Sequence, residues 1–307
     1  MPSSSFSEPV PWPPTSVPVD LAAAAVAFTD SRARDATPTA GRYRRIVQQI
    51  EQQPRPIHDV PPALPLGCLD GVQARALLGR LEHKEITLAW TSAGTVHGLT
   101  LLDHQPRLAV ICSQLDEKEV RTRAPQLPVV ALPESTPWGL ATLTDEWIDQ
   151  ARRHVEDLAV AAAPKATGKV LVVDGPLLRS SDRDDVVGVV KTHQADWLPD
   201  PDLIPTKAGW RSPGLRLPAS RTTDRNVHTA YVRLHTATSH HSYGHALIRI
   251  EVYEDSTVTL DAAAAMVHAL RGRQSSGDPR WAIQLNPMFE AENVLKAQIP
   301  HVIRTLR

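Results

Sequence analysis

The chain has only two cysteines and no long apolar run, and these two features limit the classes of protein to which it can belong. Its two cysteines, Cys68 and Cys112, stand far apart in apolar stretches of a 307-residue sequence. This spacing excludes a disulfide framework and a cysteine-rich zinc site, so both are expected to be reduced core residues. No run approaches the roughly 18 apolar residues of a membrane helix. The start, Met1-Pro2-Ser3-Ser4-Ser5, lacks the positive region of a secretory signal. We therefore expect a cytoplasmic protein.

An excess of charge of one sign is also missing. The formal net charge is -1, so any nucleic-acid contact needs a local basic groove rather than a globally basic surface. Nucleotide-binding motifs are absent too. Gly168-Lys169 resembles the end of a phosphate-binding loop, but Ala163 stands at its first glycine and Val170 at its Ser/Thr. The chain therefore carries no nucleotide-hydrolysing motor of its own.

Composition divides the chain into an arm and a domain. Residues 1–40 are rich in proline, serine, threonine and alanine, which predicts a mobile arm. A short basic helix is expected over 42–50, closed off by the prolines that follow. We assign residues 1–63 to this Pro-rich arm and residues 64–307 to one folded domain.

Apolar periodicity within 64–307 predicts an α/β or α+β domain with a mixed sheet flanked by helices. The polar stretch 193–226 is long enough to be a binding loop or a lid. Expected strands cover 66–70, 85–91, 95–102, 107–112, 127–132, 170–174, 186–190, 228–236, 244–253 and 281–285. Expected helices cover 73–81, 147–162, 261–270 and 289–305.

Two of the expected strands run into Asp-Gly pairs, Asp70-Gly71 and Asp174-Gly175. A carboxylate at a strand end is held by a rigid sheet, and glycine allows a sharp turn beside it. Carboxylates so placed suit a hard cation such as Mg²⁺ or Mn²⁺ next to a phosphate. Asp-Gly is also a favoured turn pair, and that interpretation stays open.

Lysine and acidic residues near these strands extend the pattern. Lys191 follows the run Val186-Val187-Gly188-Val189-Val190 and is placed to stabilise phosphate charge. Glu156 and Asp157 lie on the helix before the second Asp-Gly strand, off its apolar stripe, and Glu156 is nearer the boundary of that stripe. One of them is a candidate third ligand, and a solvated helix face is the alternative.

Basic residues toward the C-terminus offer nucleic-acid contacts. Arg249 and Glu251 share a face of one expected strand, where they form a phosphate-binding site with an assisting acid or an exposed pair. The long polar loop carries further candidates for backbone contact, Arg216, Arg221 and Arg225, with plain solvation as the alternative. Four histidines bracket a loop without cysteine companions and do not favour zinc: His235, His240, His241 and His245.

The order of these motifs resembles the NurA nuclease family. It runs through Leu69-Asp70-Gly71-Val72-Gln73, a helical acid, Val172-Val173-Asp174-Gly175-Pro176-Leu177, Gly188-Val189-Val190-Lys191 and Arg249-Ile250-Glu251. The resemblance covers roughly residues 64 to 303. It implies an RNase H-like fold, a Mn²⁺-dependent DNA nuclease, a homodimer, and partnership with a HerA-type hexameric ATPase that translocates DNA.

Carried over by position, the resemblance implies a set of site residues. Asp70, Glu156 and Asp174 match the acidic metal ligands, and Lys191 matches the lysine after the second motif. Glu292 stands where the family has a histidine, so it is a possible assisting residue.

The sequence therefore predicts a Mn²⁺- or Mg²⁺-dependent deoxyribonuclease. DNA end processing or anti-phage defence follows by analogy with the family. Two alternatives remain. The first is a degenerate adaptor that docks on the ATPase or holds DNA without cutting, and the second is a hydrolase of another phosphate ester.

Overall fold

The computed structural model describes residues 47–133, 136–177, 183–191, 198, 200–219, 225–237, 244–272 and 283–306. The arm expected over residues 1–40 and the start of the basic helix lie outside the described residues. Residues 193–197, 199 and 220–224 of the expected loop or lid also lie outside the described residues.

The described residues form a mixed, twelve-stranded sheet flanked by helices, which confirms the expected mixed α/β architecture. The strand order is β1-β10-β11-β12-β8-β7-β3-β4-β5-β6, and β9 joins β2 to β11. The strands are β1 Gln48–Gln49, β2 Arg55–Pro56, β3 Leu64–Leu81, β4 Lys84–His97, β5 Thr100–Ser113, β6 Val129–Leu132, β7 Lys169–Asp174, β8 Val186–Val190, β9 Trp210–Arg211, β10 Leu215–Leu217, β11 Val227–Arg233 and β12 Leu247–Tyr253.

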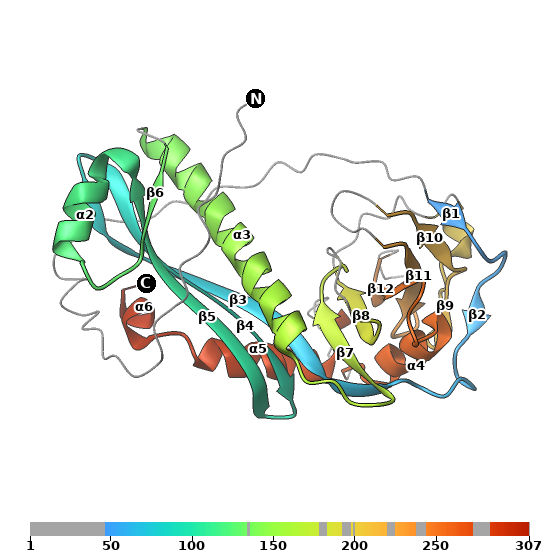
Figure 1. Ribbon diagram of the computed structural model, residues 1–307. Coiled ribbons are helices and arrows are strands. Elements are labelled where there is room, and N and C mark those ends of the chain that lie inside the picture. The colour runs from blue at the N-terminus through green and yellow to red at the C-terminus, as the bar shows by residue number, and fades with distance from the viewer. Residues whose placement is uncertain are drawn as a thin grey trace.

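Strand β3 joins two lobes of this sheet (Figure 1). It pairs in parallel with β7 from Leu64 to Leu69 and antiparallel with β4 from Cys68 to Leu81. Both neighbours are therefore present together only at Cys68 and Leu69. From Asp70 onward, the edge of β3 that faced β7 has no strand partner among the described residues.

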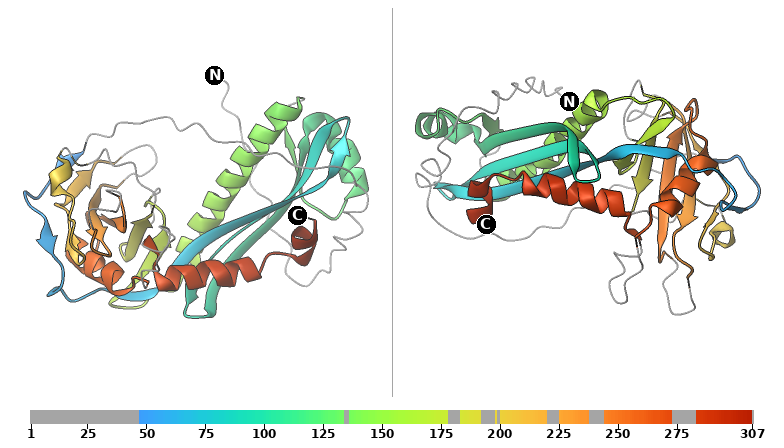
Figure 2. Two further views of the ribbon diagram at one scale, coloured as in Figure 1. Left: turned by 180° about the vertical axis from the view of Figure 1, so that it is seen from behind. Right: turned by 90° about the horizontal axis from the view of Figure 1, so that it is seen from below.

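Helices α3 (Pro137–Ala162) and α5 (Asn286–Ala297) cover opposite faces of β3 and β4 (Figure 2). The consecutive residues Ala93 and Gly94 show this, because neighbours on a strand point to opposite faces. Ala93 packs in one cluster with Val155 of α3. A Cβ on Gly94 would lie 3.2 Å from Leu295 Cδ2 of α5.

The remaining helices complete the two lobes. Helix α4 packs on β11 and β12, and the short helices α2 and α6 lie in the lobe of β3 to β6. None of the helices within the described ranges is both long and apolar enough to cross a membrane. The bounds are α2 Glu117–Arg123, α4 Leu260–Ala269 and α6 His301–Thr305, with 3₁₀ turns at Gln114–Asp116 and Pro201–Leu203.

The helix expected over 73–81 is wrong, because this segment continues β3. Its residues have good helix propensity, but their burial alternates with period two: Ala74 and Ala76 are buried, whereas Gln73 and Arg75 are exposed. Pairing with β4 along the whole segment outweighs the local propensity.

Two further boundaries differ from the expectation. Three expected strands over 85–112 are two long ones, β4 and β5, joined by a turn at Gly98 with φ +58°. The expected helix over 289–305 is two helices, α5 and α6. Pro300 precedes α6, and a proline inside a helix removes a backbone donor.

Residues before 64 take part in the sheet. The helix expected over 42–50 is wrong at Gln48–Gln49, which form β1 and pair with β10. Arg211, only 1% exposed, fastens this segment by donating to Glu51 Oε1 at 2.9 Å and Asp261 Oδ1 at 2.5 Å. The folded part of the chain therefore begins before residue 64.

Candidate active site

The predicted strand-end residues meet where β3, β7 and β8 run side by side. These strands are parallel and aligned, with Leu69 opposite Val173 and Val173 opposite Gly188. Aligned residues of parallel strands share a face, so Asp70 and Asp174 are neighbours one step further on. Asp174 ends β7. Lys191, directly after β8, donates from Nζ to Asp174 Oδ2 at 2.7 Å.

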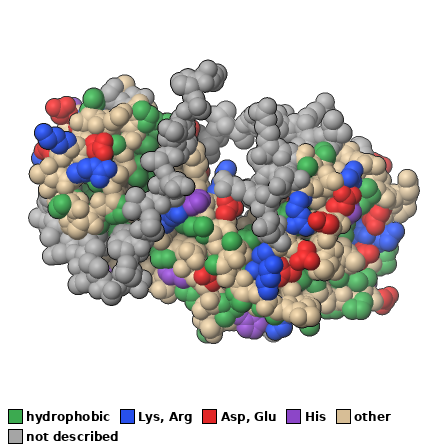
Figure 3. Space-filling view, in the orientation of Figure 1, with side chains coloured by type: hydrophobic (Ala, Val, Ile, Leu, Met, Phe, Trp, Pro, Cys, Tyr) green, Lys and Arg blue, Asp and Glu red, His purple; other side chains and the backbone are tan. Residues whose placement is uncertain are grey.

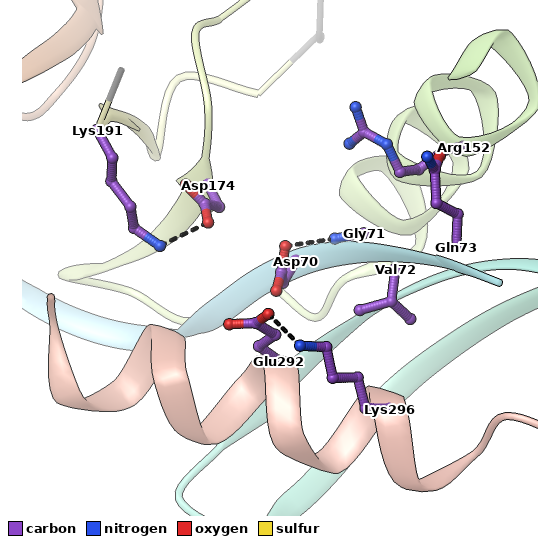
Figure 4. Close-up of a pocket in the computed structure, with 9 residues that line it drawn as sticks. All are labelled: Asp70, Gly71, Val72, Gln73, Arg152, Asp174, Lys191, Glu292 and Lys296. Atoms are coloured by element: carbon purple, nitrogen blue, oxygen red, sulfur yellow. Dashed lines mark hydrogen bonds and ion pairs between the residues drawn. The ribbon is translucent and has the colours of Figure 1, made fainter. Parts of the chain in front are cut away.

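These residues line a pocket of about 480 Å³ at the unpaired edge of β3 (Figure 4). Asp70 comes from β3, Asp174 from β7 and Glu292 from α5, and the three carboxylates gather at one side of the pocket. The full lining is Asp70, Gly71, Val72, Gln73, Arg152, Asp174, Lys191, Glu292 and Lys296.

The two Asp-Gly pairs use glycine for different reasons. Gly175 has φ +118° directly after β7, a conformation that favours glycine, so this pair does make the expected turn. Gly71 instead continues β3. A Cβ on Gly71 would lie 2.7 Å from Cγ and Cδ of Glu156, so this glycine provides space rather than a turn.

Glu156 therefore lies on the face of β3 opposite Asp70, because residues 70 and 71 alternate. It is paired with Arg152, one turn earlier on α3. Burial raises the pKa of Glu156, and Arg152 opposes that rise. Arg152 is among the residues that line the pocket, whereas Glu156 is not. Glu292 is the third lining carboxylate.

Asp70 is held unfavourably as an anion. Burial raises its pKa to about 7, the nearby Asp174 contributes, and the Gly71 N–H and Lys191 oppose the rise. Its recorded hydrogen bond comes from Gly71 N at 2.7 Å. The other lining carboxylates each pair with a lysine, Asp174 with Lys191 and Glu292 with Lys296 at 2.6 Å.

All three candidate ligands are carboxylates, the type that a hard divalent cation prefers. Within the described ranges, Asp70 forms no ion pair. The described residues hold no group of three His, Cys, Asp or Glu side chains already placed to bind an ion. A bound ion would compete with Lys191 for Asp174 and with Lys296 for Glu292.

Arg249 and Glu251 form an ion pair on β12 outside the pocket lining. They share the predicted face of β12, but the pair is buried: Arg249 Nη2 lies 2.9 Å from Glu251 Oε1. Glu251 Oε2 also accepts from Leu177 N at 2.8 Å, which fixes the chain just after Gly175. Neither side chain lines the pocket.

The basic residues that we expected to contact nucleic acid from the long loop either lie away from the pocket lining or fall outside the described residues. Arg225 pairs with Asp255 and lies 3.9 Å over the Tyr253 ring. Arg216 pairs with Glu254. Arg221 lies outside the described residues, as do His240 and His241.

The structure adds two cations that the sequence reasoning missed, Arg152 and Lys296. Each is one helical turn from an acidic candidate, and the spacing of Arg152 to Glu156 and of Glu292 to Lys296 was the available signal. Elsewhere on the visible face, acidic and basic side chains are interspersed (Figure 3). Lys296 and Arg152 therefore contribute positive charge at the pocket and do not belong to a broad basic surface on this face.

Comparisons with known proteins add little to this geometry. No protein-family model and no curated protein matches the chain. Among solved structures, a crystal structure of the NurA nuclease from Sulfolobus solfataricus matches with a TM-score of 0.39 and 10% identity, covering 83% of this chain and 85% of that one. A TM-score this low does not establish a common fold. Fold and pocket together define a mixed α/β protein with an acid-and-lysine pocket at a sheet junction.

Proposed function

We propose that this chain is a metal-dependent nuclease that hydrolyses phosphodiester bonds in DNA. The observation that carries the proposal is the pocket, in which three carboxylates from three elements face three cations. Carboxylates suit Mg²⁺ or Mn²⁺, and lysine and arginine suit the phosphate.

Asp70 and Asp174 are the proposed metal ligands, with Glu292 as the third in place of Glu156. Glu156 is held by Arg152 on the other face of β3. The bound ion would lower the pKa of an attacking water and neutralise developing charge. Lys191, 2.7 Å from Asp174, would stabilise the charge of the phosphate.

The motif order that resembles the NurA family extends the proposal. It supports an RNase H-like core, a homodimer in the cytoplasm, and a HerA-type ATPase as partner in DNA end processing or anti-phage defence. The sequence has no nucleotide-hydrolysing motif, so an ATPase in trans would supply movement along DNA.

The deciding experiment incubates the full chain with end-labelled linear DNA and Mn²⁺, with and without the ATPase. We expect degradation that Asp174→Ala abolishes and that the exposed α3 substitution Asp149→Ala leaves intact. Absence of cleavage by the wild-type chain under both conditions would contradict the proposal.

A second candidate is a non-catalytic adaptor with a nuclease-like pocket. The two lysine pairs favour it, because Asp174 and Glu292 are already neutralised. An adaptor would bind DNA or the ATPase without cleavage and would show no Mn²⁺ binding that depends on Asp70. Isothermal titration with Mn²⁺ separates the two candidates independently of the cleavage assay.

A further inference from the structure

We infer that Arg152 and Lys296 bind the substrate strand, each contacting a backbone phosphate on one side of β3. The inference deepens the proposed function and rests on it, because the phosphates are those of the nuclease substrate. It names the side chains that hold the strand, as distinct from those that act on the bond.

The placement of these two residues is the first support. Arg152 belongs to α3 and Lys296 to α5, which cover opposite faces of β3. Both nevertheless line the same pocket, because β3 is no longer paired with β7 beyond Leu69 and, among the described residues, its edge is open there. In Figure 4 the Arg152 side chain comes from the helix above β3 and Lys296 from the helix below it. A strand passing the carboxylates would have one cation on each side.

Both side chains keep donors available. Arg152 has one recorded hydrogen bond within the described residues, to Glu156, and Lys296 has one, to Glu292. A guanidinium carries five N–H groups and an ammonium three. The Arg152 and Lys296 side chains are 29% and 55% exposed. Their glutamates therefore orient them without using all their hydrogen-bonding capacity.

The charge of the pocket supports an anionic ligand. Asp70, Asp174 and Glu292 are balanced by Arg152, Lys191 and Lys296 in the lining. An acidic pocket without these cations would repel a phosphodiester, whereas a balanced one does not. A bound divalent ion would make the same pocket net positive.

The other candidate arginines are less available. The Arg249 side chain is 7% exposed and pairs with Glu251. Arg225 pairs with Asp255 and stacks on Tyr253. Contacts from Arg152 and Lys296 would go to phosphates rather than to bases, so they predict binding without sequence preference.

The test measures binding of a fluorescently labelled oligonucleotide by anisotropy, in EDTA, over a series of NaCl concentrations. Losing one phosphate contact lowers the slope of log Kd against log salt by about 0.7 to 0.9. We expect that decrease for Lys296→Gln, and again for Arg152→Gln made together with Glu156→Gln. The second change prevents a buried carboxylate from losing its partner. Combining all three changes should lower the slope by about 1.5.

Matched controls separate phosphate contact from general charge. Glu117 and Arg121 form the same i,i+4 pair on α2, away from the pocket. Replacing both by Gln should leave the slope unchanged. Lys296→Arg should restore it. Because the Lys296 side chain is 55% exposed, Lys296→Gln keeps the fold and carries the test even if the Arg152 variant unfolds.

The outcomes for binding and for cleavage are distinct. An unchanged slope in the Lys296 and Arg152 variants overturns the inference, even if the wild-type chain cuts DNA. A wild-type chain that does not bind the oligonucleotide also overturns it. A wild-type chain that binds with the expected slopes but never cleaves with Mn²⁺ overturns only the proposed nuclease.

Discussion

Glu156 fills the space that a side chain at residue 71 would need, with its Cδ 2.7 Å from where a Cβ on Gly71 would stand. The second residue of the first Asp-Gly pair is therefore fixed by a helix packing against a strand. This contact also sets the position of Arg152, which pairs with Glu156 and reaches into the pocket.

Gly71→Ala should displace Glu156 and lower the free energy of unfolding by about 2 kcal/mol, as overpacking does in a close contact. Chemical denaturation measures the change. Gly244→Ala is the control, because a Cβ there meets no atom within 4 Å. Equal stability of both variants would contradict the contact.

Asp70→Asn should stabilise the protein at high pH. The Asp70 pKa is about 7 in the folded protein against an ordinary value of 3.8, so the folded state binds this proton more tightly. Stability therefore falls as pH rises from about 4 through about 7, by roughly 4 kcal/mol at most.

Thermal unfolding in EDTA checks this prediction. The melting temperature of Asp70→Asn should exceed that of the wild type at pH 8 and match it near pH 4. Asp149→Asn, on the exposed side of α3, should show no such difference. A wild-type advantage at pH 8 would show that the carboxylate is not held unfavourably.

Lys191→Met should change metal binding and catalysis in opposite directions. Without Lys191, Asp174 no longer shares its Oδ2, so Mn²⁺ should bind roughly fivefold more tightly, the equivalent of an ion pair worth about 1 kcal/mol. Cleavage should fall about 100-fold, because the phosphate charge loses a donor. Titration calorimetry and a cleavage time course give the two values. Weaker Mn²⁺ binding would contradict the exchange of lysine for the ion.

Glu251→Ala should destabilise the protein by about 3 kcal/mol, because it breaks a buried ion pair and removes the acceptor for Leu177 N. Denaturant unfolding measures this loss. Glu117→Ala removes an exposed i,i+4 pair on α2 and should cost no more than about 0.5 kcal/mol. Similar values for both would mean that the Glu251 contacts contribute little.

Much of the architecture could be predicted from the sequence, because the apolar periodicity of each strand and the order of strands and helices can be read along the chain. The strand that ends at Asp174 and the strand that precedes Lys191 follow directly from short apolar runs. The segment 73–81 could not be assigned by propensity, since only its pairing with β4 makes it a strand. The one local signal for a strand is the alternation of Ala74 and Ala76 with the polar residues Gln73 and Arg75.

The site was harder to predict, because it depends on which face each residue takes. Asp70 and Glu156 were grouped by chemistry, but β3 separates them: Asp70 shares its face with Glu292, and Glu156 lies over Gly71. The position of α5 comes from packing late in the chain, and no local pattern gives it. Arg152 and Lys296 could not be predicted as pocket residues either, because the packing of α3 and α5 against β3 decides where they lie.

Strand β3 pairs with β4 and β7 at the same time only at Cys68 and Leu69, so movement of one lobe can be transmitted along β3 to the other. An 18-residue strand spans about 60 Å, and it is braced on both sides only over those two residues. Rotation of one lobe against the other would bend the strand immediately beside Asp70. Displacing the far end of β3 would thus change the distance between Asp70 and Asp174.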